Sequence, residues 1–513
     1  MSLKGAGVFV VMIPEHLKKF NPKERRQYRL LEIIPGSLVW LTFTLAIALS
    51  FIKPLWVIYF IIIFDLYWLF RVSYFVFYVI LAWRKYKQAI KVDWFTKVKT
   101  ISGWERIYHL ALLPTCGESI EVLRTTFKSI QNNAYPLDKF IIVLAGEERK
   151  KAIFQDNVKI LKKEFEGVFY KILFTLHPDN VAGEIKGKGA NAHYAGHKSK
   201  EFIDELEIPY EDIIVSYFDC DTCAHPEYFS CVAYKYLTHP DALRTCYQPI
   251  VNYNNNIWDA PAAMRVTAFG TIFWLMTELL KPERMFTFSS HSMGYKPLVG
   301  VGFWQKDIVT DDSRIFLQGL MHYDGDFAVT PIYVPVSMDT VLAKSYWRSF
   351  VNLYKQQRRW AWGVEHFPYM LWHFLKNKKI SFWKKFKYGW NLGEGMYSWA
   401  TAPILIFVLG RLPLALAPET VQKTVVAQNA PLVLEWLMTF AMIGLLVAAI
   451  LSVLILPPRP KTQSKYKILV MILQWIFLPV TLILFGCIPA CEAQTRLMIG
   501  KYLGFWVTEK ARK

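Results

Sequence analysis

Two acidic clusters in this chain have residue types and spacings suited to chemistry on a phosphorylated substrate. Asp219 and Asp221 directly follow an apolar stretch, and two carboxylates so placed can hold a divalent cation against a diphosphate. Asp311 and Asp312 follow Thr310, and a loop carboxylate can accept a proton from an attacking hydroxyl. The alternatives are an acidic turn for the first pair and a solvated loop or helix cap for the second. Either pair alone is therefore weak evidence of function.

The third cluster is Gln356-Gln357-Arg358-Arg359-Trp360, in a stretch whose pattern indicates a helix. Gln356 and Arg359 are three positions apart and share a helical face. Arginine suits the bidentate recognition of phosphate, and tryptophan stacks on the apolar face of a sugar ring. A basic interfacial helix with a tryptophan anchor would have the same composition. Without the other two clusters, that alternative would be preferred.

The elements that must position these residues alternate between short apolar runs and helical patterns. We expect strands over 108–113, 140–145, 169–176 and 213–218. Strands that alternate with helices indicate an α/β domain with a mostly parallel sheet and helices on its faces. Ligands of such sheets bind beyond the carboxyl ends of the strands, where Glu147 and Asp219 fall.

Long apolar runs flank this α/β region on both sides. The 513 residues are 53% hydrophobic, 16% aromatic and only 20% charged, which is more apolar than an average soluble domain. Runs of a length that can cross a bilayer, roughly 20 residues, occupy 36–52, 55–83, 398–417, 436–456 and 468–488. The sequence thus predicts transmembrane helices with a soluble domain inserted between the second and the third.

The formal net charge of +19 fits a nucleic-acid binder or a membrane protein with basic cytosolic flanks. The position of the charge decides between them, because lysine and arginine gather beside the apolar runs, for example at Arg25, Arg26, Arg84 and Lys85. We therefore expect no nucleic-acid partner. The prediction is a multi-pass protein of the cell (inner or plasma) membrane whose catalytic domain is cytosolic.

These patterns divide the chain into six predicted segments. They are a cytosolic N-terminal segment (1–35), a transmembrane hairpin (36–83), a cytosolic domain (84–348), interfacial helices (349–397), transmembrane helices (398–488) and an interfacial C-terminal segment (489–513). The fourth segment is rich in lysine and aromatic residues, which is typical of amphipathic helices on a membrane surface.

In their order and spacing, the three clusters resemble the D-x-D, T-E-D and Q-x-x-R-W motifs of the family 2 inverting glycosyltransferases. The cellulose, chitin and hyaluronan synthases are the best-known membrane members of this family. The resemblance extends from about residue 105 to residue 362, and the helix layout extends it over most of the chain. It implies a GT-A-like fold for the cytosolic domain, a nucleotide-sugar donor, expected to be a UDP-sugar, and Mg²⁺ or Mn²⁺ as cofactor.

The resemblance also implies roles for the chemical residues. Asp312 would be the catalytic base, Asp219 would contact the nucleotide, and Asp221 together with Asp219 would bind the metal. Trp360 and Asp311 would line the acceptor site. Asp311 stands where the family has glutamate, a shortening that matters little for this assignment.

The donor site implied by the resemblance contains Thr115, Glu118, Glu147, Lys188, Asn191, Asp219, Gln356 and Arg359. The chain departs from the family in two places here. Gly117 replaces a usual asparagine, and Gly146-Glu147-Glu148 stands where the family has its first aspartate. The nucleotide side of the site is therefore the part that the sequence defines least.

The end of the chain resembles the F-x-V-T-x-K gating loop of the cellulose synthases, with Phe505, Val507, Thr508 and Lys510 at the matching positions. Five crossings from a cytosolic N-terminus would leave this loop outside, away from the site. A re-entrant last run, a miscounted hairpin or an accidental match would each remove the conflict. Because Pro479 breaks the run 468–488, we favour an irregular last segment.

The resulting hypothesis is an inverting hexosyltransferase that extends a β-linked polysaccharide and translocates it across the membrane. Its acceptor is then a growing glycan. One alternative is the transfer of a single sugar to a lipid acceptor. Another is a catalytically inactive scaffold, supported only by Glu147 in place of aspartate. The sequence does not determine the donor sugar, the linkage, partner subunits or the oligomeric state.

Overall fold

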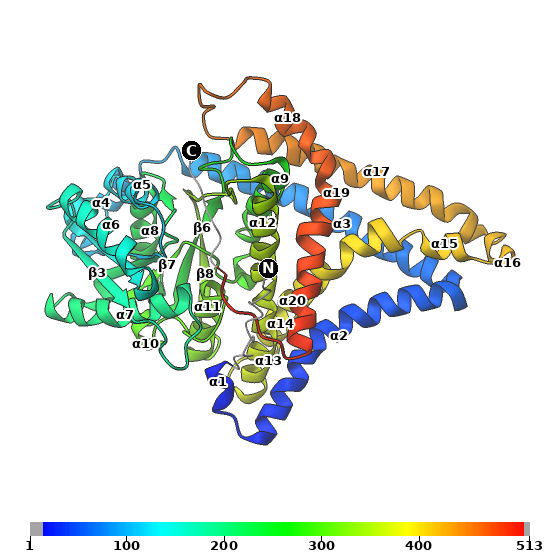
Figure 1. Cartoon of the computed structure of the whole chain (residues 1–513), viewed down its shortest axis with the longest axis horizontal. Helices are drawn as coiled ribbons and strands as arrows, with labels where there is room; N and C mark the ends of the chain where they lie inside the picture. The colour runs from blue at the N-terminus through cyan, green and yellow to red at the C-terminus, as the bar shows by residue number, and fades with distance from the viewer. Residues whose placement is uncertain (1–13, 507–513) are drawn as a thin grey trace, which may run out of the picture.

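The computed structural model describes residues 14–506 as an α/β domain joined to a set of long apolar helices (Figure 1). Within these residues, eight strands form one sheet in the order β3-β2-β1-β4-β7-β6-β8-β5. The strands are β1 (Tyr108–Pro114), β2 (Phe140–Glu147), β3 (Lys171–His177), β4 (Ile213–Tyr217), β5 (Cys223–Ala224), β6 (Thr245–Asn252), β7 (His291–Gly294) and β8 (Ala328–Ser337). The predicted α/β domain between apolar helices is confirmed.

The half of the sheet formed by β3, β2, β1 and β4 is parallel throughout. All four strands match predicted ones, because helices cover both faces and the strands are continuous apolar runs. The other half is mixed: β7 is antiparallel to β4 and β6, and β6 is parallel to β8. These strands were not predicted. They are short or interrupted by proline, and the register of β6 shifts between Pro249 and Ile250.

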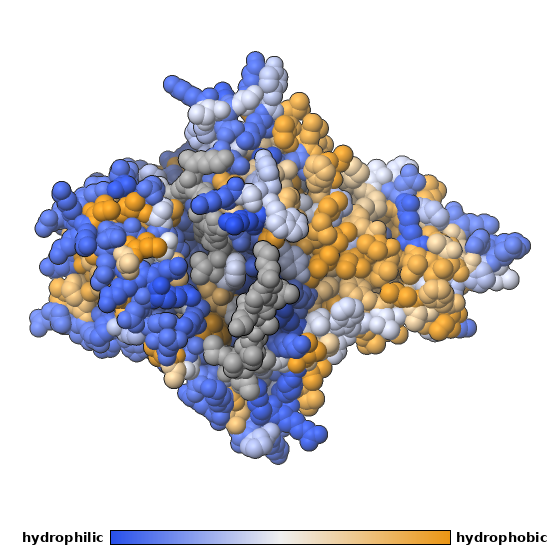
Figure 2. Space-filling model, in the orientation of Figure 1, coloured by the Kyte–Doolittle hydropathy of each residue, from blue (hydrophilic) through white to orange (hydrophobic). Residues whose placement is uncertain are grey.

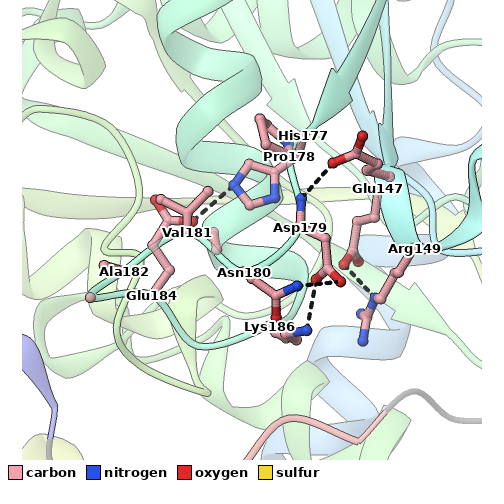
Figure 3. Close-up of a pocket in the computed structure, with 13 residues that line it drawn as sticks. Glu147, Arg149, His177, Pro178, Asp179, Asn180, Val181, Ala182, Glu184 and Lys186 are labelled. Carbon is pink, nitrogen blue, oxygen red and sulfur yellow. Dashed lines mark hydrogen bonds and ion pairs between the residues drawn. The ribbon is translucent and has the colours of Figure 1, made fainter.

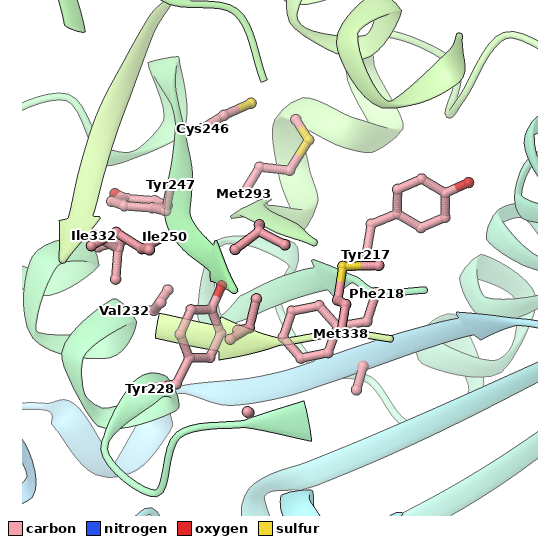
Figure 4. Packing of buried hydrophobic residues seen from close by; sticks show 14 of the residues in the cluster. Tyr217, Phe218, Tyr228, Val232, Cys246, Tyr247, Ile250, Met293, Ile332 and Met338 are labelled. Atoms are coloured by element: carbon pink, nitrogen blue, oxygen red, sulfur yellow. The ribbon is translucent and has the colours of Figure 1, made fainter. Parts of the chain in front are cut away.

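Helices cover the sheet and bury its core. They are α5 (Ile120–Gln131), α6 (Lys151–Glu164), α7 (Lys188–Glu205), α8 (Tyr228–Thr238), α9 (Ala262–Glu278), α10 (Tyr295–Gly300) and α11 (Asp311–His322). Figure 4 shows Phe218, directly after β4, near Tyr228 of α8, with Tyr217 at the end of β4 and Met293 of β7 in the same buried cluster. This packing fixes the end of β4, which carries Asp219 and Asp221.

Among residues 14–506, five helical segments are long and apolar enough to cross a membrane. They are α2 (Pro22–Ile52), α3 (Pro54–Ala89), α14 (Phe382–Ile404) extended by a π-turn to Leu409, α17 (Val425–Leu454) and the segment Lys467–Met498. The predicted boundary at residue 397 falls inside α14. Shorter helices join these elements: α1 (Glu15–Lys18), α4 (Trp94–Lys99), α12 (Tyr346–Ala361), α13 (His366–Lys376), α15 (Leu412–Leu416) and α16 (Glu419–Gln422).

The long helices present a broad apolar surface away from the α/β domain (Figure 2). Exposed side chains on it include Trp56 and Phe70 of α3 and Phe440 and Leu446 of α17. A surface of this size is rare on soluble monomers and marks contact with a partner or a membrane. Its length and composition fit helices surrounded by lipid.

The segment Lys467–Met498 takes an irregular path across the other long helices (Figure 1). It contains α18 (Lys467–Leu473), a 3₁₀ turn at Gln474–Phe477, α19 (Leu478–Thr481), a π-turn at Leu482–Cys487 and α20 (Ile488–Met498). This agrees with the irregular last segment favoured from the sequence.

Both ends of this segment contact elements near the α/β domain. Before it, Gln463 Nε2 donates to Asp259 Oδ1 at 2.7 Å, in the loop after β6. At its end, Arg29 of α2 donates to the Leu497 carbonyl at 2.7 Å, and just after it the Tyr502 hydroxyl donates to Glu32 of α2 at 2.7 Å. The loop after β6 and helix α2 therefore hold the two ends of this segment.

Candidate active site

One pocket beyond the carboxyl ends of β1, β2 and β4 brings most of the predicted site residues together. Its lining includes Thr115, Glu118, Glu147, Lys188, Asn191, Asp219, Asp221, Arg359 and Phe505. These residues come from the ends of three strands, the start of α7, the helix α12 and the last described residues of the chain. Residues far apart in the sequence thus share one opening.

Lys188, the first residue of α7, joins two of the acidic clusters. Its Nζ lies 2.6 Å from Asp219 Oδ1 and 2.8 Å from Asp312 Oδ1. The ammonium also lies 4.1 Å from the centroid of the Tyr217 ring. Burial opposes the charge of Lys188, but the nearby carboxylates outweigh burial and raise its pKa above the usual value. The D-x-D and T-D-D clusters therefore belong to one electrostatic unit.

Asp311 lies one layer deeper than Asp312. It is 2% exposed, and the Tyr217 hydroxyl donates a hydrogen bond to its Oδ2 at 2.5 Å. Burial, followed by the charge of Asp312, raises the pKa of Asp311 to about 7. Gly189 of α7 packs directly above it, since a Cβ there would lie 3.0 Å from the Asp311 Cβ. The predicted contact of Asp311 with an acceptor stays a prediction.

The carboxylates of the D-x-D cluster are held in place by neighbouring loops. Ser289 Oγ donates to Asp219 Oδ2 at 2.9 Å, and the Asp339 backbone N–H donates to Asp221 Oδ2 at 2.9 Å. Asp221 is completely buried. No group of three or more acidic, histidine or cysteine side chains suited to a metal occurs among the described residues. Two carboxylates nevertheless fit Mg²⁺ or Mn²⁺, which commonly complete their coordination with substrate phosphates and water.

Thr115, Glu118 and Asn191 shape the floor of the pocket through bonds to the chain itself. Glu118 Oε2 accepts from Thr115 Oγ1 and from the Cys116 N–H, each at 2.6 Å. Asn191 Nδ2 donates to the Ala145 carbonyl at the end of β2, at 2.7 Å. These bonds give hydrogen-bond partners to the buried Thr115 and Asn191 and to the half-buried Glu118.

A second pocket, which the sequence did not predict, adjoins the first through Glu147 (Figure 3). Glu147 pairs with Arg149 at 2.7 Å, His177 with Glu184 at 2.8 Å, and Asp179 with Lys186 at 2.7 Å. The charged residues that follow β3 are the only signal that the sequence offered. The pocket arises because β2 and β3 end side by side.

Helix α12 sends the residues of the third cluster in different directions. Arg359 reaches the pocket, with its guanidinium 4.7 Å from the centroid of the Phe505 ring. Trp360 packs on Tyr253, with ring centroids 5.7 Å apart. Gln356 is buried. Of the three, only Arg359 lines the pocket within the part of the chain that the structure describes.

The C-terminal strap, residues 499–506, follows α20 and ends beside the pocket. Phe505 packs on Gly187, immediately before α7, so closely that a Cβ on Gly187 would lie 2.6 Å from the Phe505 Cγ. The Lys355 Nζ lies 3.5 Å from the centroid of the Trp506 ring. The other predicted gating residues, Val507, Thr508 and Lys510, lie outside the described residues.

No protein-family model and no curated protein sequence matches the chain. Among solved structures, it is similar to the mannosyltransferase PcManGT from Pyrobaculum calidifontis in complex with GDP-Man and Mn²⁺. That match has 15% identity and a TM-score of 0.39 and covers 74% of this chain and 98% of the other. It is also similar to TarS 1–349 from S. aureus in complex with UDP-GlcNAc, with 9% identity, a TM-score of 0.37, and 67% and 90% covered. Likenesses this distant do not decide the substrate.

Proposed function

We propose that this protein is a membrane-embedded inverting glycosyltransferase of the processive branch of family 2. It uses a nucleotide-activated sugar, expected to be a UDP-sugar, to extend a β-linked polysaccharide that it also translocates. The observation that carries the proposal is the bridge from Lys188 to Asp219 and Asp312, in a site that Arg359 also reaches. Carboxylates for a metal, a candidate base and a phosphate-binding arginine are the parts that such a transfer requires.

In the proposed reaction, the Asp312 carboxylate accepts the proton of an acceptor hydroxyl. The acceptor oxygen forms a bond to the anomeric carbon while the bond from that carbon to the diphosphate oxygen breaks, and the nucleoside diphosphate leaves with the electron pair. Attack from the opposite face inverts the anomeric configuration. Arg359 stabilises the departing diphosphate, and a divalent cation held at Asp219 and Asp221 would neutralise part of its charge.

Lys188 links donor binding to the base in this scheme. In the structure, its ammonium is shared between Asp219 and Asp312. An arriving diphosphate competes for that ammonium, because phosphate oxygens are strong charge-assisted acceptors. Movement of Lys188 towards the donor frees the Asp312 carboxylate for the acceptor proton.

The membrane arrangement completes the proposal. The α/β domain lies in the cytosol, beside the basic flanks of α2 and α3. If Lys467–Met498 does not cross, α2, α3, α14 and α17 make four crossings. Both described ends of the chain are then cytosolic, and the strap with Phe505 lies on the same side as the site.

The test is transfer of radiolabelled sugar from a panel of nucleotide sugars by membranes that contain the protein. We expect Asp312→Asn to lower transfer by about 10²–10⁴-fold, the usual contribution of a general base. Binding of UDP with Mn²⁺ should persist, since Asp312 is not a phosphate ligand in the scheme. Asp326→Asn, at an exposed aspartate paired with Arg244, is the matched control.

Full transfer by Asp312→Asn would show that the assigned base is wrong. The length of the product separates the processive reaction from its alternative. Long labelled chains support the polysaccharide synthase, whereas a single labelled sugar on a lipid would support single transfer. Absence of transfer from every donor would favour the inactive scaffold.

A further inference from the structure

We propose that Glu365 and His366 are positioning residues for Asp312. They lie just after α12, in the turn Trp362–Glu365 and at the start of α13. Together they hold the segment around the acid pair against the helix that carries Arg359. The inference rests on the proposed function, because it assigns these residues to the geometry of the transfer step.

Glu365 clamps the residue that precedes the acid pair. Its Oε1 accepts a hydrogen bond from the Thr310 backbone N–H at 3.2 Å and another from the Thr310 hydroxyl. Its Oε2 accepts from the Trp362 indole N–H at 2.8 Å. Glu365 as a whole residue is 9% exposed, so water competes little for these bonds. One side chain thus joins the start of α11 to the end of α12.

His366 clamps the residues that follow the acid pair. Its Nδ1 accepts from Arg314 Nε at 3.1 Å, and its Nε2 lies 2.7 Å from Ser313 Oγ. Burial, followed by the charge of Arg314, lowers the pKa of His366 well below its usual value, so the ring is neutral. With Nδ1 as an acceptor, the proton sits on Nε2 and is donated to Ser313.

Arg314 extends this second clamp into the core. It is 1% exposed, its guanidinium lies 3.8 Å from the centroid of the Tyr369 ring, and its Nη1 donates to Gln305 Oε1 at 2.9 Å. Such a buried, fully engaged arginine has little freedom to move. Ser313 and Arg314 are therefore as well anchored as Thr310.

The two clamps enclose Asp311 and Asp312 from both sides along the chain. They fix the first turn of α11, from which Asp312 reaches Lys188 at 2.8 Å. Because Glu365 and His366 follow Arg359 closely, the base and the phosphate-binding arginine share one support. Misplacement by about 1 Å can cost roughly 100-fold in rate while ground-state binding persists. Loss of a clamp should therefore lower kcat and leave donor binding intact.

The test compares Glu365→Gln and Thr310→Val, which break the first clamp from its two sides. We expect each to lower kcat on the order of 10- to 100-fold. The donor KM, and the Kd for UDP measured with Mn²⁺ without turnover, should stay within about twofold, because neither residue contacts the pocket. The double variant should be little worse than the more impaired single variant, because both substitutions weaken the same contact between Thr310 and Glu365. Thr310→Ser, which keeps the hydroxyl, should restore kcat.

Tyr236→Phe is the matched control for the loss of a buried hydrogen bond. The Tyr236 hydroxyl donates to the Glu211 carbonyl at 2.7 Å. Glu211 precedes β4, whereas Asp219 follows it, so the two residues lie at opposite ends of this strand. Should Glu365→Gln not fold, Thr310→Val still tests the clamp, because it removes the Thr310 hydroxyl that donates to Glu365.

If the wild type is active, either of two results for the variants would overturn this inference and leave the proposed function intact. In the first, the clamp variants lose no more kcat than Tyr236→Phe does. In the second, they raise KM at unchanged kcat. A wild type that transfers no sugar from any donor would refute the proposed function, and the inference with it.

Discussion

At the scale of single residues, Lys188 explains how a cluster of carboxylates is stable before any substrate binds. Asp219, Asp312 and the deeper Asp311 lie close together, and like charges at such distances repel one another. The Lys188 ammonium pairs with two of them, and burial keeps Asp311 partly protonated near neutral pH. The repulsion among the three carboxylates is thus reduced in two ways, by the ion pairs with Lys188 and by the proton on Asp311.

The proton on Asp311 predicts a pH-dependent stability. The pKa of Asp311 is raised to about 7 in the folded protein, by burial and then by Asp312, and is about 4 in an unfolded chain. The folded state therefore binds this proton more tightly. The resulting stability is fully present below about pH 4 and is lost as the pH rises through about 7.

We expect the thermal stability of Asp311→Asn, relative to wild type, to improve between about pH 5 and about pH 8, because asparagine does not titrate. The measurement is the unfolding temperature in detergent across that range. The sign matters more than the size, which we expect to be a few degrees at most. A constant difference across the range would show that Asp311 does not titrate there.

At the scale of elements, the C-terminal strap and the start of α7 form one unit. Phe505 covers Gly187 and lies beside Arg359, so it contacts both the start of α7 and helix α12. Glycine at 187 allows this approach because any Cβ there would overlap the phenyl ring. The position of the strap is therefore coupled to the two elements that carry the residues proposed to bind the donor.

Gly187→Ala should push the strap away from the site. The backbone at Gly187 has φ of 171°, an extended conformation that alanine adopts, so only the clash with Phe505 changes. Overpacking costs about 1–3 kcal/mol, and trypsin cleavage after the exposed Lys501 should become roughly tenfold faster as the strap opens. Mass spectrometry of the fragments measures this rate.

Gly504→Ala provides the control within the same strap, since nothing lies within 4 Å of a Cβ at Gly504. Its cleavage rate should equal that of the wild type. In a Phe505→Ala background, Gly187→Ala should add nothing further, because the clashing ring is gone. Equal cleavage of Gly187→Ala and wild type would mean that the ring does not hold the strap.

At the scale of the whole molecule, α20 connects the apolar helices to the site. It packs against α2, α12 and α14 and then leads into the strap. On α12, Tyr354 and Arg358 both contact Glu492 of α20, at 2.8 Å and 2.6 Å. A shift of α20 within the bundle would therefore be transmitted both to α12 and to Phe505.

Gly36→Ala should separate α20 from α2 and destabilise the molecule. A Cβ at Gly36 would lie 2.7 Å from the Gln494 carbonyl oxygen, a backbone atom that no rotamer change can move. We expect a loss of about 1–3 kcal/mol in the free energy of unfolding, together with lower sugar transfer. Thermal unfolding in detergent and the transfer assay measure the two effects.

Gly395→Ala, on α14, is the matched substitution in open space, with nothing within 4 Å of its Cβ. It should keep the unfolding temperature at the wild-type value or slightly above it, because alanine favours helix by up to about 1 kcal/mol. Equal unfolding temperatures for the two variants would show that the α2–α20 contact tolerates a side chain.

The sequence alone determined the features that depend on local pattern. Strands β1 to β4 were predictable because strands covered on both faces are continuous apolar runs, and the acidic pair after β4 could then be assigned to the ligand edge of the sheet. The five long apolar segments were predictable from length and composition. Most of the candidate site followed from these two patterns and from motif order.

The tertiary structure alone decided the features that depend on partners distant in sequence. Strands β5 to β8 are defined by pairing rather than by hydrophobic period, and the pocket beside Glu147 exists because β2 and β3 end together. The sequence gives no signal for Glu365 and His366. Their role follows only from hydrogen bonds to Thr310, Ser313 and Arg314, which lie about 50 residues earlier in the chain. Likewise, hydropathy shows that residues 467–498 could span a bilayer, but contacts with Asp259 and Glu32 at its two ends determine where it lies. A hydropathy pattern records how apolar a segment is, and only packing records what it packs against.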